Sequence, residues 1–266
     1  MVRQFSISPL PHDCPNLSGT QVGYLVEFIT FNELALCLLI VLCAAIVQMS
    51  VGMGFGMLAS PFIALVKPEI VPGCIVLIGL TVALSGAWRE RKNISINELK
   101  MGIGGRVLGS LCALLLLLQI DDLDMFLFVF GLIMLIAVAM TASGMRIPFT
   151  DKNLFGLSVV SGLMGSITAV GAPPMAIIYH NRPPNIVRPT LNAFFASGCI
   201  LALISLSISG WFGFKDIIAT VLLMPSMLIG IYLSKYFVNL PPSFTSRALL
   251  ALSATASALL IFKSIY

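Results

Sequence analysis

The chain has 266 residues, of which 58% are hydrophobic and only 10% are charged. A soluble domain carries about 25% charged residues, so this composition excludes an ordinary soluble protein and indicates a polytopic membrane protein. The net charge of +4 is divided among short loops, and no basic surface is long enough to bind nucleic acid.

Residues 1–33 lack the apolar core of a cleavable signal peptide. We interpret them as an N-terminal extension, with an amphipathic lead-in over residues 24–32. No later polar stretch is long enough to form a second domain, so the rest of the chain is expected to form one transmembrane domain.

Apolar segments follow one another along the rest of the chain. About 20 apolar residues are needed to span the hydrocarbon core, and most segments reach that length. Two are too short, and each follows a full-length segment after a Gly/Pro-rich break. The sequence therefore predicts an all-α membrane protein with about eight membrane segments and two half-helices. The expected segments are 34–52, 57–66, 70–88, 101–119, 124–143, 154–170, 174–180, 190–210, 217–238 and 245–263.

The first break lies in SVGMGFGMLASPFIALV, residues 50–66. A single helix over 34–66 would be about 50 Å long, whereas the hydrocarbon core is about 30 Å thick. The chain must therefore bend, fold back or project far from the membrane. Proline is favoured in the first turn of a helix, so we expect half-helices to begin at Pro61 and Pro173.

The two breaks resemble each other. ASPFIALV (59–66) aligns without gaps on GAPPMAII (171–178), and the apolar segments repeat in the same order, five and then five. An internal duplication explains both observations. The predicted repeats are residues 34–145 and 154–266.

Two topologies are compatible with this duplication. If each broken segment folds back as a re-entrant hairpin, the halves are inverted; if it crosses the membrane fully, the halves are parallel. The first topology obeys the positive-inside tendency better. It places four basic loops in the cytoplasm: 89–100, 144–153, 181–189 and 239–247.

A broken helix can bind an anion, because the first turn of a helix has free N–H groups and a partial positive charge. Two half-helix N-termini that meet inside the bilayer would form a carrier site. Close helix packing also explains any single small residue here, but it does not explain the same interruption in both halves. The candidate substrate-binding residues are Gln48, Ser50, Gly54, Gly56, Ser60, Pro61, Ser166, Thr168, Gly171, Pro173 and Asn192.

Charged residues are distributed in a way that favours anion export. The predicted spans contain no Asp or Glu, so no embedded carboxylate is available for proton coupling. Arg106 is expected about five residues inside its span, where it either snorkels to the interface or contacts substrate. A candidate cytoplasmic anion funnel consists of Arg106, His180, Arg182 and Arg188, although three of these also fit a loop oriented by the positive-inside tendency.

The glycine-rich breaks VGMGFGMLASP (51–61) and MGSITAVGAPP (164–174), with the chain length and the two-repeat order, resemble the sulfite exporter TauE/SafE family of anion permeases. The resemblance implies transport of a small sulfur-containing anion, such as sulfite or a sulfonate like sulfoacetate. Ile167, Thr168, Ala169 and Val170 stand where the family often has more glycine, so substrate contacts are expected to differ here.

The leading hypothesis is a secondary carrier that exports such an anion across a bacterial inner membrane. The alternatives are Na⁺- or H⁺-coupled uptake of a sulfonate or carboxylate, and a membrane assembly subunit that transports nothing. We expect no enzyme, cofactor or metal site, because the two histidines lie far apart and the spans lack acids. The expected partners are a small anion and the lipid bilayer.

Overall fold

The computed structural model describes residues 30–236 and 253–262, and within these ranges the chain forms helices and no strands. The chain divides into two units, Met1–Leu36 and Cys37–Tyr266. In the first unit, the described residues begin α2 with a capping box, since Glu33 N–H donates to Thr30 Oγ1 at 3.4 Å and Thr30 N–H donates to Glu33 Oε2 at 3.0 Å. The rest of α2 and all later described elements belong to the second unit.

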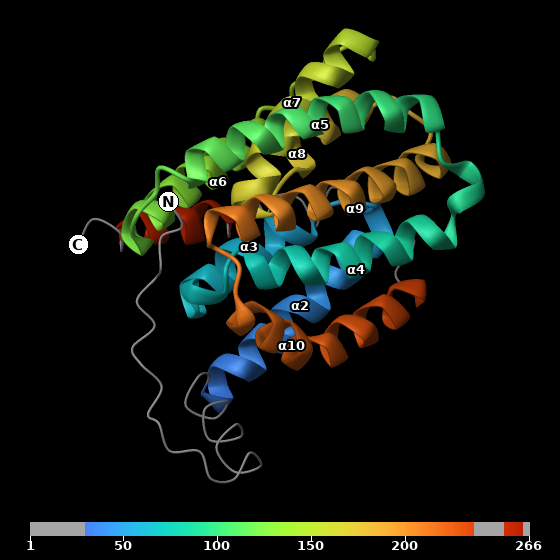
Figure 1. Cartoon of the computed structure of the whole chain (residues 1–266). Coiled ribbons are helices and arrows are strands. Elements are labelled where there is room, and N and C mark those ends of the chain that lie inside the picture. The colour runs from blue at the N-terminus through green and yellow to red at the C-terminus, as the bar shows by residue number, and fades with distance from the viewer. Residues whose placement is uncertain (1–29, 237–252, 263–266) are drawn as a thin grey trace. The chain divides into compact units, whose positions relative to one another are not determined.

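The helices agree closely with the apolar segments expected from the sequence (Figure 1). Five of them (α2, α5, α6, α9 and α10) contain stretches that are long and apolar enough to cross a membrane, which supports a polytopic membrane protein. Part of the last expected segment, residues 245–252, lies outside the described residues. The helices are α2 (Phe31–Val51), α3 (Phe55–Val66), α4 (Gly73–Arg89), α5 (Ile96–Leu117), α6 (Leu123–Ala142), α7 (Asp151–Thr168), α8 (Ala172–Tyr179), α9 (Pro184–Ser209), α10 (Phe214–Leu233) and a helix over Ser253–Phe262.

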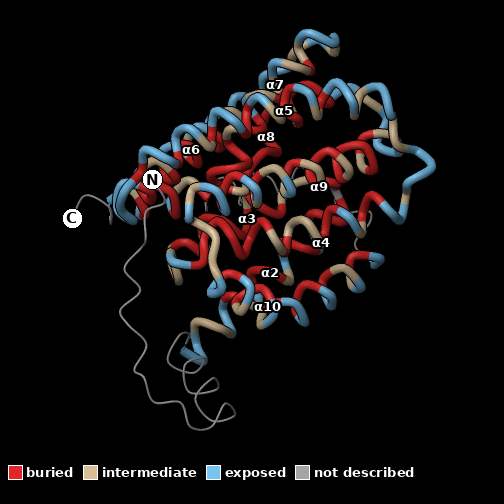
Figure 2. Tube along the Cα trace, viewed as in Figure 1, coloured by how far each residue is buried: buried red, intermediate tan, exposed pale blue. Residues whose placement is uncertain are grey.

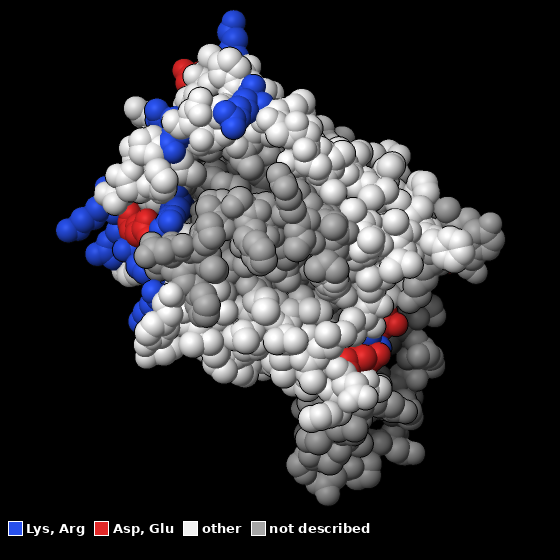
Figure 3. Space-filling view, turned by 180° about the vertical axis from the view of Figure 1, so that it is seen from behind, with Lys and Arg blue, Asp and Glu red and all other residues white. Residues whose placement is uncertain are grey.

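Three basic loops lie together at one end of the bundle, which we call the basic end. Ser95 N–H, before α5, donates to Thr190 Oγ1 in α9 at 3.0 Å, and Arg182 forms an ion pair with Glu98. Figure 3 shows Lys and Arg side chains gathered at one end of the molecule. The loops within 89–100, 144–153 and 181–189 are thus grouped as the first topology requires, while 239–247 lies outside the described residues.

The loops before α4, before α6 and between α9 and α10 lie at the opposite end, which we call the acidic end. Trp211, after α9, stacks on Phe126 at the start of α6, with ring centroids 4.4 Å apart. Gly73, the first residue of α4, lies against the carboxyl group of Asp216 in the first turn of α10. The long helices therefore alternate in direction between the two ends.

Helices α2 and α3 form a hairpin that opens toward the acidic end. Leu38 and Leu42 of α2 contact Ser226 and Gly230 of α10 in the same order, so α2 runs parallel to α10 toward the basic end. The chain then reverses at residues 52–54, where Gly52 and Gly54 have φ of +88° and +114°, values that L-residues rarely adopt. Helix α3 returns to η1 (Pro68–Ile70), which contacts α10.

Helices α7 and α8 form a second hairpin that opens toward the basic end. The chain reverses at Ala169, a non-glycine residue with φ of +61°. The ring centroid of Phe149, which precedes α7, lies 5.2 Å from that of Tyr179, the last residue of α8. In this half the chain therefore enters and leaves the break from the same end of the bundle.

The two hairpins meet in the middle of the bundle, where α3 and α8 are largely buried (Figure 2). Ser60 of α3 donates to the Thr168 carbonyl at the end of α7, at 2.6 Å. A Cβ on Gly56 would lie 2.0 Å from the carbonyl oxygen of Ala169. The breaks are thus in direct backbone contact.

Helices α5 and α7 pack side by side along a seam of small residues (Figure 1). A Cβ on Gly105 would lie 2.4 Å from the Phe155 carbonyl oxygen, and one on Gly109 would lie 2.0 Å from that of Val159. This Gly-x-x-x-Gly spacing allows backbones to approach closely in a membrane protein. This close packing places the α5 residues between Gly105 and Gly109, which include Arg106, beside the break that follows α7.

Pro61 does not begin a half-helix, contrary to the sequence-based expectation. Helix α3 starts at Phe55 and contains Pro61 in its interior, whereas Pro173 lies in the first turn of α8 as expected. A proline inside a helix leaves the carbonyl four residues earlier without its N–H donor. Here that carbonyl belongs to Met57, and the hydroxyl of Ser253 donates to it at 3.0 Å.

We predict that Ser253→Ala lowers the free energy of unfolding by about 1 kcal/mol, because the Met57 carbonyl loses its donor. Adding Pro61→Ala restores an N–H donor within α3 and should recover that loss. Thermal unfolding of the purified protein in detergent measures both. Ser257→Ala is the control, since that hydroxyl donates to a carbonyl of its own helix; an equal effect of this variant would contradict the prediction.

Candidate functional site

A small internal cavity lies where the two hairpins meet. Its volume is about 40 Å³, which is room for about three water molecules. Backbone from both breaks borders it, together with residues of α4, α5 and α9. The lining residues are Gln48, Gly54, Phe55, Gly56, Met57, Ile75, Val76, Gly79, Ala83, Arg106, Gly165, Ala169, Val170, Gly171, Ala172, Phe195 and Cys199.

Arg106 brings a positive charge to this cavity. Its side chain is only 3% exposed, and its guanidinium group lies over the rings of Phe194 and Phe195, at 4.7 and 5.6 Å. Arginine remains protonated in proteins, so the cavity carries a full charge. Within the part of the chain that the structure describes, Arg106 has no carboxylate partner and its Nε has no hydrogen-bond partner.

One hydroxyl group and several glycines hold this guanidinium in place. Arg106 Nη1 donates to Ser161 Oγ at 2.9 Å, and Ser161 Oγ donates to the Gly171 carbonyl oxygen at 2.6 Å. A Cβ on Gly198 would lie 1.7 Å from Nε, and one on Gly165 would lie 2.7 Å from Nη2. The group is therefore wedged between α7, α9 and the second break.

The depth of Arg106 follows from where α5 begins. The sequence suggested a start near residue 101, but α5 starts at Ile96, which puts Arg106 about 15 Å from the first residue of the helix. The side chain points into the bundle and contacts glycines there, so it neither snorkels to the interface nor joins His180 and Arg182 at the basic end.

The first break presents backbone donors to the cavity. The side-chain amide of Gln48 holds the break in place. Its Oε1 accepts from Phe55 N–H at 3.0 Å. Its Nε2 donates to the Gly52 carbonyl oxygen at 3.3 Å and to Asn192 Oδ1 at 3.0 Å. The next N–H groups, at Gly56 and Met57, belong to a first turn that has no intrahelical acceptor for them. Both residues line the cavity.

The second break presents fewer donors than the sequence suggested. Pro173 and Pro174 occupy the first turn of α8, and proline has no N–H. Val170 N–H is already bonded to Thr168 Oγ1 at 3.2 Å. The Arg106 guanidinium lies beside this break and replaces the missing amides as the source of positive charge.

Most of the hydroxyl groups proposed as ligands bind protein carbonyls instead. Ser60 and Thr168 donate to the carbonyls of Thr168 and Met164, and Ser166 donates to Ser110. Among the candidate substrate-binding residues, the structure brings Gln48, Gly54, Gly56 and Gly171 to the cavity. The others do not line it: Ser50, Ser60, Pro61, Ser166, Thr168, Pro173 and Asn192.

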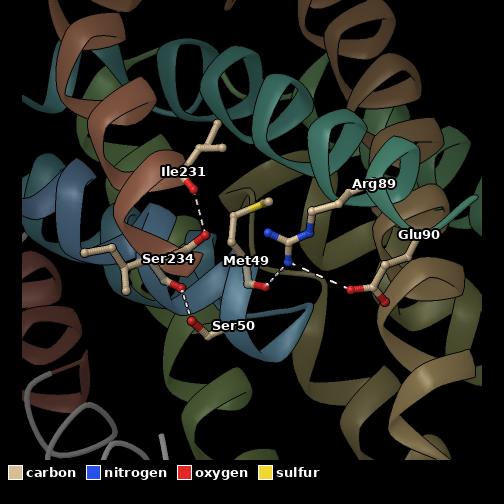
Figure 4. Close-up of polar contacts among 7 residues, drawn as sticks. Met49, Ser50, Arg89, Glu90, Ile231 and Ser234 are labelled. Atoms are coloured by element: carbon tan, nitrogen blue, oxygen red, sulfur yellow. Dashed lines mark hydrogen bonds and ion pairs between the residues drawn. The ribbon is translucent and has the colours of Figure 1, made fainter. Parts of the chain in front are cut away.

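A cation caps the C-terminus of α2 at the basic end of the bundle. Arg89, at the end of α4, donates to the Met49 carbonyl oxygen at 3.3 Å and lies 3.8 Å from Glu90 (Figure 4). The hydroxyl of Ser50 points back to the Ile46 carbonyl oxygen. A cation at the last turn of a helix offsets the negative end of its dipole, so Arg89 stabilises the first break.

A second, larger cavity of about 280 Å³ opens at the basic end. Arg182 lies 4.6 Å from the Phe149 ring centroid and is paired with Glu98, while His180 Nδ1 contacts the Ile177 carbonyl oxygen at 2.9 Å. Of the expected funnel, His180 and Arg182 are here, whereas Arg188 lies against Gly52. The lining residues are Arg146, Pro148, Phe149, Ile178, His180, Asn181 and Arg182.

Sequence reasoning missed several residues of the two cavities. Ser161, which positions Arg106, and Cys199, which lines the central cavity, carried no pattern that marked them. Arg146 was assigned only to topology. A usable indication did exist for Arg106, since GIGGRVLG (102–109) surrounds the arginine with glycines, and glycine seams mark close helix contact.

Comparison with known proteins gives one match. The sequence model described as "Sulfite exporter TauE/SafE" matches residues 37–261. No curated protein matches the chain, and no solved structure does. The matched region includes α2 from Cys37 onward, the whole of α3, α7 and α8, and both cavities.

We predict that Gly56→Ala abolishes transport, because the added Cβ would lie 2.0 Å from the Ala169 carbonyl oxygen and push the breaks apart. Gly79→Ala is the matched control, since Gly79 lines the same cavity and its added Cβ has 3.6 Å of clearance. Anion flux into proteoliposomes, normalised to protein in the membrane, compares the two. Equal flux would show that contact between the breaks is dispensable.

Proposed function

Because the chain belongs to the sulfite exporter TauE/SafE family, a family of membrane transporters, we propose that it is a secondary carrier that exports a small sulfur-containing anion. Substrate binds in the cavity between the first turn of α3 and the break before α8. Helix N-termini that meet at such interruptions are the usual substrate sites of secondary carriers.

One observation carries this proposal: a buried arginine borders the cavity, and no carboxylate in the described part of the chain pairs with it. Burying a cation is costly unless an anion or strong dipoles compensate it, and a bound oxyanion would supply that compensation. Gly56 and Met57, whose N–H groups have no intrahelical acceptor, line the same space from the opposite hairpin. An oxyanion there is held by charge on one side and by amide donors on the other.

Sulfite is the proposed substrate. The cavity is small, about 40 Å³, and sulfite is a small sulfur oxyanion. Sulfoacetate carries an additional carboxymethyl group and would need more room beside Arg106.

We assign the basic end to the cytoplasm of a bacterial inner membrane, following the positive-inside tendency. The 280 Å³ cavity at that end is then a vestibule in which Arg146, His180 and Arg182 collect anions. The oppositely directed hairpins α2–α3 and α7–α8 are the broken elements of two inverted repeats, residues 34–145 and 154–266.

The charges around the cavity suit export. No Asp or Glu is among its lining residues, and buried Asp216 lies at the acidic end, where it accepts from Gly213 N–H at 2.8 Å. Moving one negative charge outward gains about 2.3 kcal/mol per 100 mV of inside-negative potential. Export therefore needs no sodium or proton gradient.

A flux assay tests the proposal against the other functions. Proteoliposomes are loaded in turn with sulfite, sulfoacetate, isethionate, acetate or sulfate, without a sodium or proton gradient. We expect sulfite efflux that accelerates under an inside-negative potential. Strict dependence on a sodium or proton gradient would identify a coupled uptake carrier, and absence of flux for every anion would favour an assembly subunit.

We predict that Arg106→Gln weakens sulfite binding at least tenfold, because a hydrogen bond to a charged group contributes about 1.5–3 kcal/mol. Arg106→Lys should recover little of the loss, since an ammonium group lacks the planar fork that reaches both Ser161 and an anion. Isothermal titration in detergent measures affinity. Unchanged affinity in Arg106→Gln would remove the arginine from the site.

We predict that Arg146→Gln raises the sulfite concentration for half-maximal efflux a few-fold without lowering the maximal rate. A vestibule charge raises local anion concentration, and salt screens that effect, so the difference should vanish at high ionic strength. Lys152→Gln is the control, because Lys152 is exposed near the same end but does not line the vestibule. An equal effect of both variants would indicate a general surface charge effect.

A further inference from the structure

The positive charge of the central cavity has no counter-charge of its own. Nine of the chain's 11 acidic residues lie in the described part, and none of these pairs with Arg106; Asp13 and Glu27 lie outside it. The side-chain contacts of Arg106 are the Ser161 hydroxyl and two aromatic faces. These contacts stabilise a guanidinium group but leave its net charge in place.

Close contacts on several sides fix this charge beside the cavity. The guanidinium lies against Gly165 of α7, Gly171 at the break and Gly198 of α9, with a Cβ on any of them closer than 3.0 Å to a nitrogen of the group. Ser161 further ties it to the Gly171 carbonyl. We therefore expect the cation to stay beside the cavity when a hairpin moves.

The empty and the anion-loaded carrier therefore differ in the net charge at the site when it is closed to both sides of the membrane. With an anion bound, the cation is compensated. Without one, the cation is buried in the bundle interior, 3% exposed, without the charge that a bound anion supplies, which is unfavourable. Closure around an empty site is disfavoured, and closure around an occupied site is not.

We propose that this protein is an anion exchanger: each divalent sulfite that leaves is replaced at Arg106 by one small monovalent anion that enters. Each cycle then moves one net negative charge outward, so an inside-negative potential still accelerates efflux. This inference rests on the export function proposed above and specifies its coupling. The counter-anion must enter the same small cavity and needs only charge and hydrogen-bond acceptors. A small inorganic anion such as chloride fits that description.

A trans-stimulation experiment with the full-length protein tests this. Proteoliposomes loaded with radiolabelled sulfite are diluted into chloride, into unlabelled sulfite or into gluconate at equal ionic strength, with the membrane potential clamped. Gluconate is much larger than chloride or sulfite. We expect efflux at least tenfold faster into chloride and into sulfite than into gluconate, with labelled chloride entering as sulfite leaves.

The outcomes separate this inference from the export function. Equal efflux into chloride and gluconate would overturn exchange while leaving export intact. Efflux into external sulfite alone would overturn chloride as the counter-anion and retain exchange. No efflux in any of the three would overturn both proposals.

Arg106→Gln provides a second readout. Its empty site carries no charge, so any remaining efflux should lose its preference for chloride over gluconate. If the ratio of efflux into chloride to efflux into gluconate is the same in this variant as in the wild type, the arginine is not the cause of exchange. If the variant does not transport, the ratio of efflux into chloride to efflux into gluconate in the wild-type protein alone decides whether exchange occurs.

Discussion

The contact between the two helix breaks is the constraint on which the rest of the structure depends. Ser60 binds the Thr168 carbonyl, and Gly56 lies against the Ala169 carbonyl. Backbone groups that do not form helical hydrogen bonds are costly in an apolar interior, so each break must find partners within the protein. The hairpins supply those partners to each other, and the small polar cavity is the space that remains between them.

The two breaks solve this problem with different chemistry. The first uses glycines at positive φ and the amide of Gln48. Its Gly56 and Met57, whose N–H groups have no intrahelical acceptor, line the cavity. The second uses Ala169 and a proline pair, which remove donors, and relies on Arg106 for positive charge. The site is therefore asymmetric although the hairpins resemble each other, and its charge belongs entirely to the side formed by α5, α7 and α9.

The sequence predicted the helices and both interruptions well, because apolar length and Gly/Pro content reflect the cost of exposed backbone in lipid. It placed Arg106 too near the interface, since hydropathy does not register that α5 extends over the polar residues from Ile96 onward. It also assigned Ser60, Ser166 and Thr168 to substrate. In an apolar interior, hydroxyl groups bind nearby carbonyls or other hydroxyls, and only the three-dimensional contacts show which acceptor each one takes.

The hydrogen bond between Ser253 and the Met57 carbonyl has a consequence for biogenesis. Met57 borders the central cavity, and its donor comes from a helix synthesised 196 residues later. During insertion, the first hairpin must wait in the bilayer with that carbonyl unsatisfied until the final helix arrives. Completion of the contacts around this cavity is thus one of the last steps of assembly, and a chain arrested before this helix would lack the donor to Met57.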